Sequence, residues 1–211
     1  MNSCQKKIGI KLSIIFSITI FCSDLCVRIL SKNYPQLDLY FLYFLQQRRH
    51  LILDFIFPTI YQIGTAEVTG LIVACILLFL IRKRYWLEVK TLVFATLGIL
   101  ILVDRILKPL FDRRRPPKPR LVEDLSRESF PSGHAAGSVV LYFYLSFIIC
   151  LRYPQKAKYV YTLATIFILL IGFSSVYVNA HWATDIIAGY AFGYCWLMIS
   201  LIYFRFSKCK Q

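Results

Sequence analysis

The stretch FPSGHAAGSVVLYFYLSFIIC, residues 130–150, places a proline turn, a hydroxyl, a glycine and an imidazole directly before a long apolar run. The apolar part has the length and composition of a membrane-spanning helix. Ser132 is a predicted N-cap, so the backbone N–H groups of Gly133 and His134 open the helix and point outward. Such a helix start binds anions. The stretch therefore predicts a spanning helix that begins at an anion site.

The rest of the chain is equally apolar. Of its 211 residues 58% are hydrophobic and 16% aromatic, and the mean hydropathy is +0.60, whereas soluble domains are about 45–50% apolar on a similar count. We expect one integral membrane domain over residues 1–211, with a motif-bearing core at 105–190. The length leaves little room for a second, soluble domain.

Hydropathy predicts an all-α bundle of six transmembrane helices. The expected spans are 12–30, 64–81, 89–107, 135–151, 159–178 and 184–204. All eight prolines fall outside these ranges, which supports the boundaries because proline breaks helices. Residues 37–60 are aromatic-rich, but Gln46 to His50 interrupt them, so they predict a short interfacial helical segment between spans one and two.

The net charge of +14 comes from 25 Lys and Arg residues against 11 Asp and Glu. These cations fall in short clusters between apolar runs, which argues against a nucleic-acid partner. Cytoplasmic loops collect such residues for topological reasons. If the cluster at 105–127 serves chemistry, the remaining charges place the N-terminus inside and predict a multi-pass protein of the cytoplasmic (inner) membrane. The seven cysteines mostly lie in apolar runs and predict buried apolar side chains.

Six spans bring the connections after spans three and five to one face, whichever way the protein is oriented. The first connection holds KPLFDRRRP at 108–116 and PSGH at 131–134, and the second holds SSVYVNAHWATD at 174–185. These are the conspicuous polar motifs of the chain. Their shared face predicts a single site.

The residue types in these motifs indicate phosphoryl transfer. Asp185 stands four positions after His181, where its carboxylate can accept the Nδ1 proton and leave Nε2 as a nucleophile or base. His134 is the candidate acid for a leaving oxygen. Lys108 and Arg115 supply fixed positive charge, so the chemistry is expected to need no metal or other cofactor.

The motifs resemble those of the type 2 phosphatidic acid phosphatases, the membrane lipid phosphate phosphatases related to vanadium haloperoxidases and bacterial acid phosphatases. The family pattern Lys-x6-Arg-Pro matches residues 108–116, Pro-Ser-Gly-His matches 131–134, and Ser-Arg-x5-His-x3-Asp matches Ser174, His181 and Asp185.

The resemblance implies a role for each matched residue. It makes His181 the nucleophile that forms a phosphohistidine, Asp185 its orienting partner, and His134 the acid. The phosphate oxygens would be held by Lys108, Arg115, Ser132 and the Gly133 amide. Ser174 and Arg114 complete the predicted substrate-binding set. In membrane members of the family the site faces the extracytoplasmic side.

One position departs from the family pattern, because Ser175 stands where the third motif has arginine. Arg113 and Arg114 are the candidates to replace the missing charge. The leading hypothesis is a phosphatase whose partners are the membrane and a phosphorylated lipid, namely a polyprenyl diphosphate, phosphatidylglycerol phosphate, phosphatidic acid or a lipid A phosphate. The sequence does not choose among these lipids, and the oligomeric state stays open.

Two other hypotheses remain. The first is a catalytically weakened family member that binds phosphorylated lipid as a sensor or scaffold, a possibility that Ser175 raises. The second is a transporter, because Asp24, Glu67 and Asp104 are acidic groups within predicted spans. The short chain and the absence of an inverted repeat argue against transport.

Overall fold

The computed structural model describes residues 23–32, 35–123 and 125–209, and this part of the chain is all-α. Residues 23–30 are helical. The longer helices that follow are α2 (Gln36–Gln46), α3 (Leu51–Ile63), α4 (Ala66–Arg82), α5 (Trp86–Ile101), α7 (Gly133–Arg152), α8 (Ala157–Tyr177) and α9 (Ala183–Cys209). Short helical elements are η1 (Leu102–Leu107), α6 (Lys108–Phe111) and η2 (Pro154–Lys156). Extended pairing in the described residues is limited to an isolated bridge between Arg114 and Glu128.

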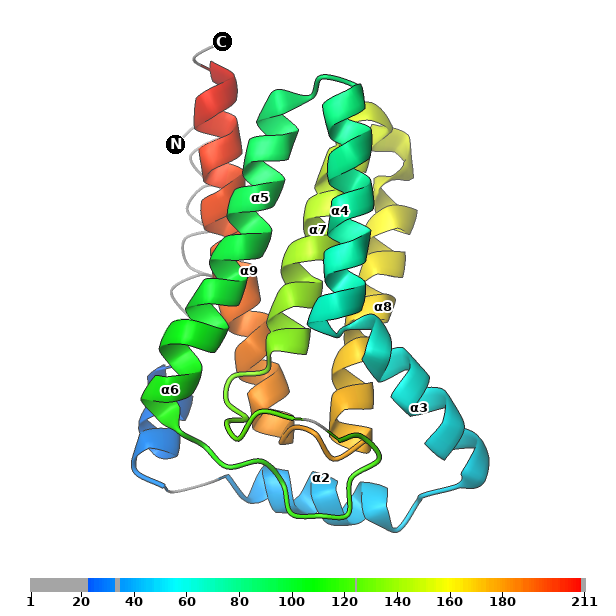
Figure 1. The fold of residues 1–211 in the computed structure, drawn as a ribbon, viewed down its shortest axis with the longest axis vertical. Helices are drawn as coiled ribbons and strands as arrows, with labels where there is room; N and C mark the ends of the chain where they lie inside the picture. Colours follow the sequence, from blue (N-terminus) through cyan, green and yellow to red (C-terminus); the bar gives the residue numbers. More distant parts are fainter. Residues whose placement is uncertain (1–22, 33–34, 124, 210–211) are drawn as a thin grey trace, which may run out of the picture.

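Helices α4, α5, α7, α8 and α9 run along the long axis of the molecule (Figure 1). The middle of the bundle is α7, which packs against α5, α8 and α9, while α5 also packs against α4 and α9. Buried apolar side chains of α5, α7 and α9 form the main core, among them Leu92, Ile99, Val140, Tyr144 and Leu197. The long loop at residues 112–132 and the short loop at 178–182 lie at the same end of this bundle (Figure 1).

Two glycines of α9 bring it close to α7. A Cβ added at Gly189 would lie 2.6 Å from the Ser132 carbonyl oxygen, and one at Gly193 would lie 2.6 Å from the Ala136 carbonyl oxygen. Any larger residue would push the helices apart, as expected for small residues four apart at a helix interface. This contact places the start of α9 beside the start of α7, where the Ser132 N–H donates to the Asp185 carbonyl over 3.1 Å.

Four helices of the described part are long and apolar enough to cross a membrane. They are Trp86–Phe111, Gly133–Arg152, Pro154–Tyr177 and Ala183–Lys208. Helices α3 and α4 pass the same test only together, bent by 49° at the break between them. The expected span 12–30 lies largely outside the described residues, so the count of six spans stays a prediction.

The segment expected at the membrane surface forms two helices. Helix α2 lies across the end of the bundle that carries the two loops, and α3 slants away from it (Figure 1). The outer side of α3 exposes Leu51, Ile52 and Phe55, with Leu51 87% exposed. Pro58 lies inside α3, although a proline in the sequence usually indicates the end of a helix.

The third expected span ends later than hydropathy indicates. Helix α5 continues through η1, a π-helix, into α6, so the helical run ends at Phe111 and not at Leu107. Lys108 therefore projects from the last helical turn and not from the connection. The π turn changes the direction of the side chains that follow it, and such turns are frequent at functional sites.

Candidate active site

The three sequence motifs meet at the end of the bundle where α2 lies. Asn179 of the 178–182 loop donates from Nδ2 to the carbonyls of Pro117 and Pro119, over 2.6 and 3.0 Å. The N–H of Leu121 donates to the Val178 carbonyl over 3.1 Å. These bonds tie the 112–132 loop to the loop that carries His181.

His181 and Asp185 meet although they do not lie on one helix. His181 precedes α9, which begins at Ala183, and the two side chains meet because Asp185 reaches back over the helix start. Its Oδ2 accepts the Trp182 N–H at 3.0 Å and lies 3.4 Å from Nδ1 of His181. A carboxylate that caps its own helix start in this way has a fixed orientation.

The other ring nitrogen of His181 faces a cation. Nη1 of Arg115 lies 3.3 Å from Nε2 of His181 and donates to the Ala180 carbonyl over 2.7 Å. Since a guanidinium only donates hydrogen bonds, Nε2 is the acceptor and the ring proton is on Nδ1, toward Asp185. Nε2 is thus the nitrogen that carries the free electron pair.

Burial keeps His181 neutral. Its side chain is 2% exposed, and this loss of solvation lowers its pKa to about 4, although Asp185 acts in the opposite direction and Arg115 adds to the lowering. At neutral pH the imidazole is therefore unprotonated. This is the state that a histidine nucleophile needs.

The start of α7 forms the second half of the site. The Ser132 hydroxyl accepts the Ala135 N–H at 3.3 Å, which confirms the predicted N-cap. A Cβ placed on Gly133 would lie 4.0 Å from Nζ of Lys108. The lysine ammonium therefore stands beside the helix N-terminus, where both favour an anion.

His134 completes this half of the site. Its ring centroid lies 6.3 Å from that of His181, with the planes 58° apart. Nε2 of His134 is buried and has no hydrogen-bond partner among the described residues. The two imidazoles thus flank the region that Lys108 and Arg115 make positive.

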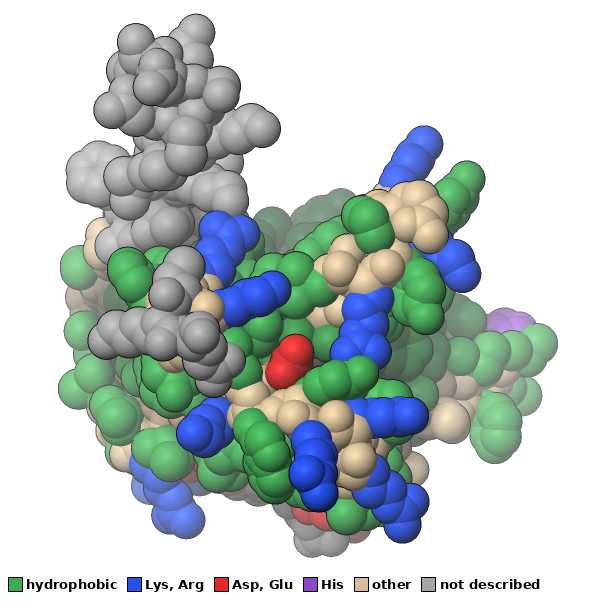
Figure 2. Space-filling model, turned by 90° about the horizontal axis from the view of Figure 1, so that it is seen from above, with side chains coloured by type: hydrophobic (Ala, Val, Ile, Leu, Met, Phe, Trp, Pro, Cys, Tyr) green, Lys and Arg blue, Asp and Glu red, His purple; other side chains and the backbone are tan. Residues whose placement is uncertain are grey.

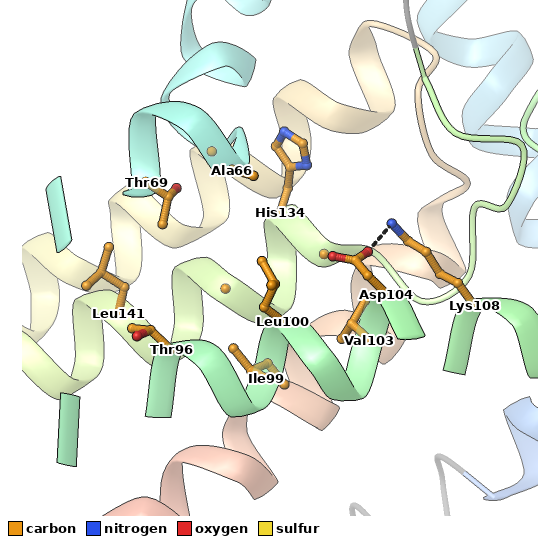
Figure 3. Close-up of a pocket in the computed structure, with 13 residues that line it drawn as sticks. Ala66, Thr69, Thr96, Ile99, Leu100, Val103, Asp104, Lys108, His134 and Leu141 are labelled. Carbon is orange, nitrogen blue, oxygen red and sulfur yellow. Dashed lines mark hydrogen bonds and ion pairs between the residues drawn. The ribbon is translucent and has the colours of Figure 1, made fainter. Parts of the chain in front are cut away.

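An apolar cavity leads away from this region between α4, α5 and α7. Its volume is about 180 Å³, and Lys108, Gly133 and His134 line it together with Asp104. The remaining lining residues are Gly64, Ala66, Thr69, Thr96, Ile99, Leu100, Val103, Gly137 and Leu141. Figure 3 shows Ala66, Thr69 and Leu141 on one side of His134 and the Lys108–Asp104 ion pair on the other.

Lys108 is held by an acid one helical turn away. Its Nζ lies 2.5 Å from Oδ1 of Asp104, and the lysine side chain is 14% exposed. The sequence shows Asp104 as an acidic residue inside a span, which also fits a transporter. The structure instead makes it the counter-ion of the predicted phosphate-binding lysine.

A buried ion network holds the carboxylate of Asp185. Arg113 donates from Nη1 to Oδ1 of Asp185 and from Nη2 to Oδ2 of Asp38, each over 2.5 Å. Asp38, on α2, also accepts the N–H and the hydroxyl of Thr184 at 2.9 and 2.7 Å. Both Arg113 and Asp38 are only 2% exposed. The sequence analysis missed both: Asp38 lies outside the motifs, and Thr184 stands at an unspecified position of the third one, directly before Asp185.

Both η nitrogens of Arg113 are engaged with buried carboxylates, Nη1 with Oδ1 of Asp185 and Nη2 with Asp38. This pairing argues against Arg113 as the replacement for the missing family arginine. Ser175 is fully buried and its hydroxyl donates to the Ile171 carbonyl. The Ser174 hydroxyl donates to the same carbonyl, over 2.7 Å, and the contacts described for its side chain stay within α8.

Arg114 lines a cationic cavity of about 530 Å³ together with Arg115 and Arg127. Its part in substrate binding stays a prediction.

Comparison with known proteins agrees with this geometry. A family model described as the PAP2 superfamily matches residues 89–209. Phosphatidylglycerophosphatase B of Bacillus subtilis (strain 168) is 32% identical over 119 residues, which cover 55% of this chain and 57% of that protein. The match thus spans little more than half the length of this curated relative.

Two solved structures have the same fold. One is the first transmembrane PAP2 type phosphatidylglycerolphosphate phosphatase from Bacillus subtilis, with a TM-score of 0.81, 22% identity, and coverage of 90% of this chain and 94% of the other. The second is LpxE from Aquifex aeolicus, with a TM-score of 0.65, 27% identity, and coverage of 79% and 96%. The family model covers more than half of the chain and includes all three motifs, so the resemblance predicted from these motifs is confirmed and the chain belongs to the PAP2 superfamily.

Proposed function

We propose that this protein is a lipid phosphate phosphatase that works through a phosphohistidine. Nε2 of His181 attacks phosphorus while the bond from phosphorus to the lipid oxygen breaks. His134, in its protonated form, gives its Nε2 proton to that oxygen. A water molecule then attacks the phosphohistidine, with His134 taking the proton, and inorganic phosphate leaves. The observation that carries the proposal is the pair of imidazoles flanking a cationic helix start.

The cations act where charge develops. Lys108, the Gly133 amide and Arg115 would bind the phosphoryl oxygens, and Asp185, 3.4 Å from Nδ1 of His181, would accept the proton of that nitrogen. Donors held in place by the fold stabilise a transition state without reorganising. On this proposal no metal ion takes part, and the chain acts as one domain.

The substrate is proposed to be an amphiphile. The apolar cavity between α4, α5 and α7 begins at Lys108 and His134, so a phosphate bound there would extend its hydrocarbon chain among the helices. Phosphatidylglycerol phosphate is the first candidate, since the curated relative of 32% identity is named for it, and the other phosphorylated lipids remain candidates.

The proposal is tested by phosphate release from the purified chain in detergent micelles. The panel contains phosphatidylglycerol phosphate, phosphatidic acid, a polyprenyl diphosphate, a lipid A phosphate and soluble 4-nitrophenyl phosphate. We expect release from at least one lipid at a kcat/KM well above that for the soluble ester, unchanged by EDTA. Stoichiometric lipid binding without release would support the sensor alternative instead. Loss of activity in EDTA that Mg²⁺ restores would contradict the mechanism.

The site is further proposed to face away from the cytoplasm. Figure 2 looks onto the opposite end of the bundle and shows Lys and Arg side chains gathered on it. The exposed cations of the helix ends there are Arg82, Lys83, Arg84, Lys90, Arg152, Lys156, Lys158, Arg205 and Lys208. At the site end Lys108 and Arg113 pair within the site, and the exposed cations described there include Lys32, Arg48, Arg105, Arg114, Lys118 and Arg127. The nine at the opposite end outnumber them and favour that end as the cytoplasmic one.

Thiol labelling of intact cells tests this orientation. Lys118→Cys lies on the exposed part of the 112–132 loop, and Lys156→Cys lies on the exposed turn at the other end. We expect a membrane-impermeant maleimide to label Lys118→Cys in intact cells and Lys156→Cys only after lysis, each above the labelling of the unsubstituted chain. The reverse pattern would overturn the orientation and leave the grouping of the motifs untouched.

A further inference from the structure

The imidazole of His134 is stacked against an aromatic ring that belongs to none of the sequence motifs. Tyr61, in the last turn of α3, lies with its ring centroid 4.3 Å from that of His134 and its plane at 19°. The tyrosine is 4% exposed. A parallel contact this close restrains the tilt of the imidazole, because aromatic rings pack in few relative geometries.

Gly64 approaches the same imidazole three residues later. A Cβ added there would lie 2.7 Å from Cδ2 of His134 and 2.8 Å from Cγ2 of Ile171. The glycine has φ −88° and ψ −4°, which any residue adopts, so the backbone does not require glycine here. The lack of space requires glycine instead, because the imidazole of His134 occupies the place where a Cβ would lie.

The segment that carries both residues is itself held firmly. Phe57 of α3 packs on Tyr177 and Phe173 of α8, with ring centroids 4.4 and 5.2 Å apart. The Tyr177 hydroxyl donates to Oδ1 of Asp54 over 2.6 Å. Residues 61–65, here named the α3–α4 elbow, are thus fixed against α8 before α4 begins, and Figure 3 shows His134 beside Ala66 at that start.

We propose that the α3–α4 elbow positions His134 for proton transfer to the departing lipid oxygen, with Tyr61 and Gly64 as its positioning residues. The inference rests on the proposed function. Nε2 of His134 has no partner in the described structure, so that nitrogen does not anchor the ring. A proton donor must lie within hydrogen-bond reach of the leaving oxygen, and small displacements of such groups are costly to the rate.

The test uses the dependence on the leaving group. An alkyl phosphate needs its oxygen protonated as it departs, whereas 4-nitrophenolate leaves readily as an anion. His134→Gln should therefore lose about 10²- to 10⁴-fold in kcat on the lipid substrate and much less on 4-nitrophenyl phosphate. A residue that positions His134 must reproduce this difference, and a residue needed only for folding would slow both substrates alike.

Four variants of the purified chain are compared on both substrates. Tyr61→Leu and Gly64→Ala should lower kcat on the lipid about ten- to a hundredfold, with little change in KM and a smaller loss on the aryl ester. Tyr61→Phe keeps the ring and should restore most of the activity. Gly70→Ala is the matched control for Gly64→Ala, because nothing lies within 4 Å of its added Cβ.

The double variant of Tyr61→Leu with His134→Gln should be no slower on the lipid than His134→Gln alone. Equal losses on both substrates, or a further loss in the double variant, would overturn the inference.

NMR of the labelled histidines distinguishes a failure of the positioning role from a failure of the proposed function. If the wild type releases no phosphate, the function fails, yet the His134 ring protons should still shift in Tyr61→Leu and not in Tyr61→Phe. Unchanged shifts in Tyr61→Leu would sink the positioning role itself.

Discussion

Replacing His181 with glutamine should lower phosphate release from the lipid substrate by roughly 10⁴-fold or more, because the group that forms the covalent intermediate is gone. The neutral ring, with Nε2 facing Arg115 and Nδ1 facing Asp185, is the structural basis of this expectation. Unlike the loss in His134→Gln, this loss should be nearly equal for a lipid phosphate and for 4-nitrophenyl phosphate.

Trapping the intermediate gives the measurement. Wild-type protein quenched during turnover of ³²P-labelled lipid should carry a label that survives alkali and is released by acid, as a phosphohistidine does, and His181→Gln should carry none. His50 offers a matched control, since it caps α3 by accepting the Ile52 N–H at 3.3 Å. Asparagine also caps helices, so His50→Asn should keep both label and turnover. Label on another residue, or an active His181→Gln, would refute the histidine nucleophile.

Replacing Arg113 with leucine should destabilise the protein more than other single changes near the site. It would leave the carboxylates of Asp38 and Asp185 buried without their shared cation, and breaking a buried pair in this way costs about 3–5 kcal/mol. In a chain of this size the loss corresponds to about 6–20 °C in the unfolding temperature. Activity should fall as well, because Asp185 would lose the contact that fixes it opposite His181.

Thermal unfolding in detergent measures this effect. Arg127→Leu is the control, since it removes an exposed pair of 3.3 Å with Asp112, and such pairs contribute about 0–1 kcal/mol. Asp38→Asn combined with Arg113→Leu should be less damaging than the sum of the two single changes, because the double variant buries one unpaired charge fewer. Additive losses, or an Arg113→Leu variant as stable as Arg127→Leu, would contradict the network.

Local patterns in the sequence predicted the long apolar helices and the candidate members of the site. Apolar runs of spanning length predicted α5, α7, α8 and α9. Each of these helices places its side chains in lipid or in the protein core over its whole length, so its composition is apolar throughout. The N-cap at Ser132 followed from a hydroxyl residue placed directly before an apolar run. The order of the motifs predicted that Lys108, His134 and His181 would meet, since alternate connections of a bundle emerge on one face.

Contacts between distant segments decided the rest. Asp38 contacts Thr184, 146 positions away, and Tyr61 stacks on His134. The periodicity of apolar residues along a sequence does not predict such contacts between distant segments. The helical run continues through the π turn, so Lys108 lies in a helix. Asp185 contacts His181 because its carboxylate caps the start of α9, and the two residues do not lie on one helical turn. Arg113, which the sequence offers as a substitute phosphate ligand, faces the buried carboxylates instead. The physical reason is that hydropathy records whether a side chain leaves water, whereas its partner depends on how whole helices pack.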